Sequence, residues 1–328
     1  MPVVTRGRPD RPTPGTTGEC HMPLTSRMLV AGLLAASWVS QPSALHAQTL
    51  FERSPTYADL ADLSFSAGMI ALVRIETQIP IDPQRAQAAL PGYTRFYVEA
   101  QAKTLLAGRK PLGRSVRYLV DLPLDWRGKA DDLEGEEVFI FARGVDGRPG
   151  ELQLVTPTAQ LRWSNARELQ LRSLLRAAVS PDGPPRITGV RSLLHVPGAL
   201  LGEGRTQIFL STQDGSYASI TVRHHPGLPP EWNISFSELI ADAIEPPARD
   251  TLPWYRLACS LPPVPPPDAN VSQSEAGRMQ ALADYRLVLD SMGSCDRKLK
   301  FRPKAVSPSF LVAARGHEQV QSPTHWKA

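Results

Sequence analysis

Short segments of alternating apolar and polar residues, separated by glycine and proline turns, dominate the sequence between residues 54 and 163. The clearest segment is 69–79, where Arg74 and Glu76 alternate with apolar residues of the opposite face. Such period-two alternation is typical of a strand with one buried side. We therefore expect five strands in this region, at 69–79, 96–103, 116–122, 137–143 and 151–155.

Five strands in a stretch of about 100 residues, the first two of them long, predict a small closed barrel of the OB type. A charged loop, from Asp131 to Glu137, precedes the fourth strand. Some other antiparallel α+β sheet is the alternative. A short helix is expected before the first strand, because Ser54 and Pro55 form a helix-start signal.

The run VFIFARGVDGRPGELQLVTPTAQLRW, followed by a helix, resembles the closing hairpin of netrin-type OB domains such as the tissue inhibitors of metalloproteinases. The resemblance covers residues 66–178 and concerns the fold. Those inhibitors use an N-terminal cysteine and several disulfides, whereas residues 66–178 contain no cysteine. Their inhibitory chemistry therefore cannot be transferred to any residue of this chain.

The second half of the chain combines strands with helices. A helix is expected from an N-cap at Asn165 to the linker SPDGPP at 180–185, and another, with a capping box at Ser272, over 275–292. Asp214 and Gly215 form a two-residue hairpin signal. The sequence thus predicts an α+β protein, with an N-terminal five-stranded OB-like antiparallel barrel in 48–180 and a C-terminal antiparallel sheet with helices in 186–295. Its further strands are expected at 191–196, 206–212, 217–224 and 232–236, and its further helices at 237–244 and 250–260.

The first 47 residues are typical of an export leader. Arg27 precedes an apolar run at 28–39, and small residues follow up to Ala47, which is the build of a signal peptide over about 22–47. The run is too short to span a hydrocarbon core as a helix. A periplasmic or secreted protein without a transmembrane span in the mature chain is expected. The alternative is an inner-membrane anchor through an uncleaved leader, and translation can also begin at Met22 or Met28.

The formal charge of +4 does not belong to the expected folded body. Residues 1–47 carry four arginines against two acidic residues, and 296–328 carry seven basic against two acidic residues. The region 48–295 keeps 25 basic and 28 acidic residues, a net charge of −3. A body that binds nucleic acid is therefore disfavoured, and no nucleic-acid partner is expected, because such binding needs clustered positive charge. The segment 296–328 is expected to be a basic tail, disordered or loosely docked.

Two cysteines, Cys259 and Cys295, stay in the chain once the leader with Cys20 is removed. An even pair in an exported chain predicts a disulfide. Two free thiols or half of a metal site are the alternatives. A metal site is disfavoured because no CxxC or paired histidine accompanies either cysteine.

No motif in the sequence specifies a reaction. Nucleophile elbows, zinc-binding helices, phosphate loops and dinucleotide fingerprints are all missing, so we expect no catalytic residue, metal or cofactor. Three histidines, His195, His224 and His225, are candidates for a general base or a metal cluster together with Asp214 or Glu231. For each, a strand-end or surface position is the alternative. A further candidate contact surface is a charged hairpin tip formed by Arg143, Asp146 and Arg148.

The runs RYLVDLPLD, FARGVDGRPGELQLV, VPGALLGEGRTQIFL and RDTLPWYRLACSLP resemble exported proteins of uncharacterised function from GC-rich proteobacteria. An excess of arginine over lysine in 48–295, 22 against 3, agrees with such a genome. The first hypothesis is a non-enzymatic module that binds a protein or a cell-envelope component. The alternative is a hydrolase or metal-dependent enzyme that uses His195, His224 or His225 with a carboxylate.

Overall fold

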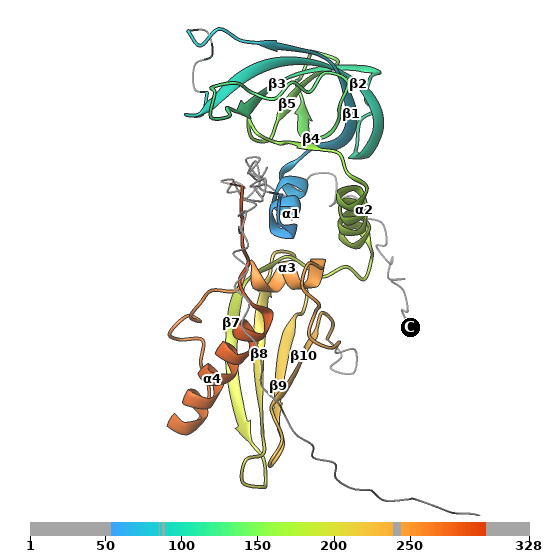
Figure 1. Cartoon of the computed structure of the whole chain (residues 1–328). Coiled ribbons are helices and arrows are strands. Elements are labelled where there is room, and N and C mark those ends of the chain that lie inside the picture. The colour runs from blue at the N-terminus through green and yellow to red at the C-terminus, as the bar shows by residue number, and fades with distance from the viewer. Residues whose placement is uncertain (1–53, 85, 87–88, 239–243, 300–328) are drawn as a thin grey trace, which may run out of the picture. The chain divides into compact units, whose positions relative to one another are not determined.

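A computed structural model describes residues 54–84, 86, 89–238 and 244–299. All of them belong to one compact unit, Thr49–Ala328. The expected leader, most of the expected helix at 237–244 and the expected tail beyond residue 299 lie outside the described residues. The α+β prediction is confirmed, with a barrel followed by an antiparallel sheet and helices (Figure 1).

The N-terminal sheet closes into a five-stranded barrel because β1 pairs with β2 on one edge and with β4 on the other. The strand order around the barrel is β1-β2-β3-β5-β4, and a short β6 shares the outer edge of β4 with β5. One pairing departs from the antiparallel expectation, since β3 and β5 are parallel. A closed ring with an odd number of strands must contain such a pair. The strands are β1 (Met69–Pro80), β2 (Tyr93–Gly108), β3 (Ser115–Pro123), β4 (Glu137–Gly144), β5 (Glu151–Leu154) and β6 (Gln160–Arg162).

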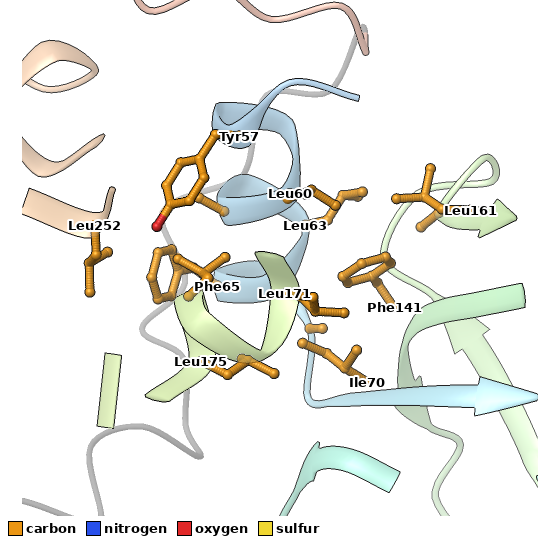
Figure 2. Packing of buried hydrophobic residues seen from close by; sticks show 14 of the residues in the cluster. Tyr57, Leu60, Leu63, Phe65, Ile70, Phe141, Leu161, Leu171, Leu175 and Leu252 are labelled. Carbon is orange, nitrogen blue, oxygen red and sulfur yellow. The ribbon is translucent and has the colours of Figure 1, made fainter. Parts of the chain in front are cut away.

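Strand β4 is buried on both of its faces. It therefore differs from the one-sided strands that alternation of apolar and polar residues predicts. Residues Val138 to Ala142 are all buried, because one face lines the barrel interior and α1 contacts the strand. Three register shifts in the pairing of β1 with β2 mark bulges, which let long strands bend around a barrel. Figure 2 shows the apolar side chains that join the barrel to the first two helices, among them Ile70, Phe141, Leu161, Leu60, Leu63 and Leu171.

Two helices, α1 (Tyr57–Ser66) and α2 (Asn165–Val179), flank the barrel strands in the sequence and contact each other. Every residue of α1 is buried. The N-caps differ by one or two positions from the expected ones: Thr56 forms a capping box with Asp59, and Ser164 accepts a hydrogen bond from the Arg167 N–H. A side chain can cap only when its own backbone is extended, as both of these are.

The C-terminal sheet is fully antiparallel, with strand order β10-β9-β8-β7. Its strands are β7 (Ile187–Pro197), β8 (Gly204–Thr212), β9 (Ser219–His224) and β10 (Glu231–Ser235). The expected turn lies between β8 and β9, where Gly215 has a φ of 76° that favours glycine. Two helices follow, α3 (Leu252–Ala258) and α4 (Glu275–Met292), and α4 packs on β7 and β8. The N-cap of α4 is Ser274, because the Ser272 hydroxyl accepts a hydrogen bond from the His195 N–H.

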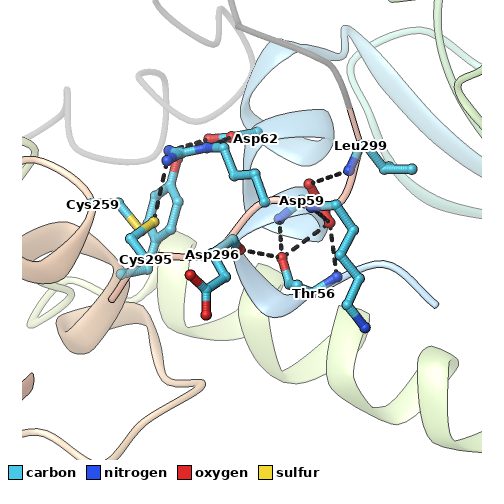
Figure 3. Close-up of polar contacts among 10 residues, drawn as sticks. Thr56, Asp59, Asp62, Cys259, Cys295, Asp296 and Leu299 are labelled. Atoms are coloured by element: carbon cyan, nitrogen blue, oxygen red, sulfur yellow. Dashed lines mark hydrogen bonds and ion pairs between the residues drawn. A yellow bond between two sulfur atoms is a disulfide. The ribbon is translucent and has the colours of Figure 1, made fainter. Parts of the chain in front are cut away.

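The predicted disulfide between Cys259 and Cys295 is present, with a Cα–Cα distance of 5.1 Å (Figure 3). It joins the end of α3 to the segment after α4. That segment, 296–299, is docked on α1 through Asp59, whose carboxylate accepts the N–H groups of Lys298 and Leu299 at 3.0 and 3.1 Å. The first residues of the expected tail are therefore part of the folded body.

A second buried aspartate on α1, Asp62, completes this attachment. It accepts a 2.6 Å hydrogen bond from the Tyr255 hydroxyl of α3 and a 2.5 Å ion pair from Arg297. Burial, followed by the nearby Asp62 charge, raises the pKa of Tyr255, so the phenol keeps its proton and donates it. The two aspartates thereby fix both α3 and the C-terminal segment to the first helix. In the described part of the chain, no helix is both long and apolar enough to cross a bilayer.

Candidate functional site

Two of the three candidate histidines meet at one end of the C-terminal sheet. The antiparallel register places Thr206 of β8 opposite His195 of β7, and Gly204 of β8 opposite His224 of β9. Both rings lie on the sheet face that α4 covers, where Asp284 projects from the helix. The ring centroids are 6.2 Å apart. We call His195, Thr206, His224 and Asp284 the polar cluster.

Asp284 is the centre of the polar cluster and is 1% exposed. Its carboxylate accepts a hydrogen bond from the Thr206 hydroxyl, lies 2.8 Å from His224 Nε2, and accepts a 2.9 Å bond from the Gln280 amide. Because the threonine proton is directed at Asp284, its oxygen accepts from His195 Nδ1, 2.8 Å away. His195 therefore carries its proton on Nδ1. The carboxylate accepts three hydrogen bonds, which compensate for its burial.

A missing side chain at Gly204 makes room for the His195 ring. A Cβ on this glycine would lie 2.8 Å from His195 Cε1 and 3.0 Å from its Nε2. Real Cβ atoms essentially never make a contact as short as the first, so a side chain here would displace the ring. The second glycine of the LGEGRT run, which by sequence indicated only a turn, therefore lets the imidazole lie close to the neighbouring strand.

His195 is held in its neutral form by burial. Desolvation lowers its pKa below the ordinary value, against the raising effect of the Asp284 charge, and the nearby His224 lowers it further. The unfolded chain then binds this proton more tightly than the folded chain does. The folded state is consequently favoured above the ordinary pKa of about 6.5 and loses stability as the pH falls below it.

We expect the free energy of unfolding to decrease from pH 7.5 to about pH 5.5, with His195 contributing part of the slope. Urea denaturation of the wild type and of His195→Asn at both pH values measures it. The variant should show a shallower dependence, because it has no imidazole to protonate. The control is His225→Asn, since His225 is exposed in the turn after β9. Equal slopes in all three proteins would contradict this assignment.

The order of groups in the polar cluster differs from that of a nucleophilic triad. Such a triad needs a histidine between the hydroxyl and the carboxylate, so that the imidazole can take the hydroxyl proton. Here Thr206 lies between His195 and Asp284 and directs its proton to the carboxylate. No group of three or more histidine, cysteine, aspartate or glutamate side chains among the described residues is arranged to hold a metal ion.

The other candidate residues lie apart from this cluster. His225 is exposed and contributes its carbonyl oxygen to the turn before β10. Arg143 bonds the Ser66 carbonyl at 2.9 Å and so ties β4 to the end of α1. Asp146 is exposed at the tip of the β4–β5 hairpin, where Arg148 forms an exposed ion pair with Glu151. An exposed ion pair of this type contributes little to stability.

Directly beyond the polar cluster, two neighbouring loops form an apolar surface, which we call the hairpin end. It consists of residues 196–202, which comprise the last two residues of β7 and the loop that follows, and of residues 226–230, between β9 and β10. A Cβ on Gly202 would lie 3.9 Å from Pro226 Cα, so the two loops are in contact. The largest exposed side chains in it are Leu201 (99%), Leu200 (64%), Leu228 (64%) and Val196 (47%).

Sequence reasoning missed two of these features. Asp284 follows His224 by 60 residues, and only the packing of α4 on the sheet brings them together. A signal was available, because Asp284 falls between Ala281 and Val288 on the buried stripe of α4, where an ionised residue needs partners. The hairpin end carries its own signal, since both loops lack the polar side chains that turns usually have.

Comparison of the sequence with protein-family models and with curated proteins finds no match in either set.

Proposed function

We propose that the chain is an exported, non-enzymatic binding module that attaches to a component of the cell envelope through the hairpin end. The observation that carries this proposal is the group of leucines at 200, 201 and 228, which two adjoining loops hold away from the core. Contiguous exposed apolar residues are typical of a surface that contacts a partner or a membrane. The leader-like segment at 22–47 and the disulfide support an oxidising compartment, the periplasm or the exterior.

Cell fractionation tests the proposal. The full chain, expressed with its own leader, should be recovered with the envelope fraction, and Leu200→Gln/Leu201→Gln should shift it to the soluble periplasmic fraction. The wild type and the double variant both keep the leader. An uncleaved leader that anchors the chain would therefore retain both proteins in the envelope fraction. An unchanged distribution of the double variant would therefore overturn the proposed surface. Leu169→Gln is the matched control, because Leu169 is a similarly exposed leucine on α2 (62%).

A second candidate is a hydrolase in which His224 acts as a general base. The observation in its favour is the 2.8 Å contact between His224 Nε2 and the buried Asp284, because a carboxylate that orients an imidazole is a recurring catalytic arrangement. Hydrolysis of a simple ester such as p-nitrophenyl acetate tests it. The hydrolase requires activity that His224→Gln abolishes and that the exposed His225→Gln retains. Equal rates for the two variants would reject it.

A further inference from the structure

The hairpin end lacks polar side chains altogether, and this property restricts the class of partner. Residues 196–202 read Val-Pro-Gly-Ala-Leu-Leu-Gly, and residues 226–230 read Pro-Gly-Leu-Pro-Pro. Protein interfaces surround their apolar centre with polar groups that form hydrogen bonds across the contact. A hydrocarbon phase offers no such bonds and penalises every polar group that enters it. The two loops carry no polar side chain and can enter such a phase, whereas the polar residues at their base, among them Glu203 and His225, stay outside it.

Several backbone N–H groups of the hairpin end already have hydrogen-bond acceptors at the base of the loops, which favours transfer into a hydrocarbon phase. The Glu203 carboxylate, at the base of the first loop, accepts the N–H groups of Ala199 and Leu200 at 3.0 and 3.1 Å. The Gly198 N–H bonds the Glu203 carbonyl, and in the second loop the Leu228 N–H bonds the His225 carbonyl. Prolines at 197, 226, 229 and 230 have no N–H group to satisfy. Fewer backbone donors must therefore lose water when the loops leave it.

The base of the two loops is held in place by the sheet and by α4. Their strands are joined by the β8–β9 ladder, and the polar cluster connects β7, β8 and β9 to Asp284 of α4 immediately below them. A surface that is already ordered loses little conformational entropy when it binds. The base from which Leu200, Leu201 and Leu228 project is thus held by the sheet and by the polar cluster.

Two arginines lie at the border of the apolar surface. Arg205 of β8 and Arg223 of β9 are directly opposite each other in the ladder, both exposed. Like charges in this position repel, which is costly unless an anion lies between them. Glu231 of β10 is opposite Arg223, yet no ion pair forms between these two, and neither arginine has a side-chain partner among the described residues. The pair is therefore available to phosphate oxygens.

Building on the proposed function, we propose that the envelope component is the phospholipid bilayer itself: the leucines of the hairpin end enter the acyl region of an anionic monolayer, while Arg205 and Arg223 bind lipid phosphates. The arrangement follows the general order of a membrane interface, with apolar groups deepest and long cationic side chains at headgroup level. Glu203 stays at the base of the loop, neutralised in part by the N–H groups it accepts.

Vesicle flotation with the purified full-length protein tests the insertion. Vesicles of equal parts phosphatidylethanolamine and phosphatidylglycerol should carry the wild type upward. Leu201→Gln should lower the partition coefficient at least about tenfold, because burying one leucine contributes that much or more to binding. Leu169→Gln should bind like the wild type. Since Leu201 is 99% exposed, its replacement leaves the fold intact, which circular dichroism can verify.

The headgroup contact needs a separate variant. Arg205→Gln/Arg223→Gln should lose the preference for phosphatidylglycerol over phosphatidylcholine vesicles and should lose most of the salt dependence of binding. If the double variant keeps both the preference for phosphatidylglycerol and the salt dependence of binding, the proposed role of the arginines is wrong.

The results also separate this inference from the proposed function. If the wild type binds no vesicle, or if Leu169→Gln weakens binding as much as Leu201→Gln, insertion into lipid is rejected. Envelope recovery that still depends on Leu200 and Leu201 would then identify a protein or another envelope component as the partner. If the wild type binds no vesicle and its recovery in the envelope fraction does not depend on Leu200 and Leu201, both the inference and the proposed function are rejected.

Discussion

Removing the disulfide by Cys259→Ser/Cys295→Ser should lower the free energy of unfolding by about 3–4 kcal/mol. The bridge closes a loop with a sequence separation of 36 residues, and the main effect of such a closure is a smaller conformational entropy of the unfolded chain. Urea denaturation of the oxidised wild type, the reduced wild type and the double variant measures the difference. The reduced wild type and the double variant should have the same free energy of unfolding.

The docked segment 296–299 keeps contacts with α1 that do not depend on the disulfide. Reduction frees Cys295 from α3, but the hydrogen bonds from Lys298 and Leu299 to Asp59 do not involve the sulfur atoms. The reduced protein should therefore keep its cooperative transition, shifted to lower urea. A loss below about 1 kcal/mol would show that these contacts alone restrain the segment.

Asp284→Ala should destabilise the protein by about 3 kcal/mol, the second large effect. The substitution deprives the Thr206 hydroxyl, which is fully buried, and the His224 imidazole of their common acceptor. Buried polar groups that lose their partner cost about 1–3 kcal/mol each. Asp284→Asn should cost less, because the amide oxygen can still accept one of the two bonds.

The matched control is Asp290→Ala on the same helix. Asp290 is exposed, so its removal should change stability by no more than about 0.5 kcal/mol. Thermal or urea unfolding of the three variants provides the comparison. Similar losses for Asp284→Ala and Asp290→Ala would mean that the aspartate acts through helix electrostatics and not through the polar cluster.

Local patterns in the sequence predicted much of the fold. The alternation in 69–79 and the Asp214–Gly215 pair correctly indicated a strand and a hairpin turn, because both depend on neighbouring residues only. The helix at 275–292 also agrees with α4. The parallel pairing of β3 with β5 could not be found in this way, since it follows from closure of the whole ring.

The candidate site was predictable only in part. His195 and His224 stood out as titratable residues at strand ends, but their common partner Asp284 belongs to a helix that packs on the sheet from far along the sequence. The same limit applies to the contacts of Asp62 with Tyr255 and of Asp59 with Lys298, which span more than 190 residues. Contacts of such separation depend on tertiary packing, which local propensity does not encode.

The attachment of residues 296–299 to α1 also affects the order of folding. The chain is synthesised from its N-terminus, so Asp59 and Asp62 exist long before Arg297 and Leu299. Until those residues emerge, Asp59 has only its N-cap partner Thr56 and Asp62 lacks the Arg297 guanidinium, so burying α1 is less favourable. The full set of hydrogen bonds to Asp59 and Asp62 can therefore form only after residues 297–299 have been made. Native packing around α1 therefore depends on residues that lie more than 230 positions further along the chain.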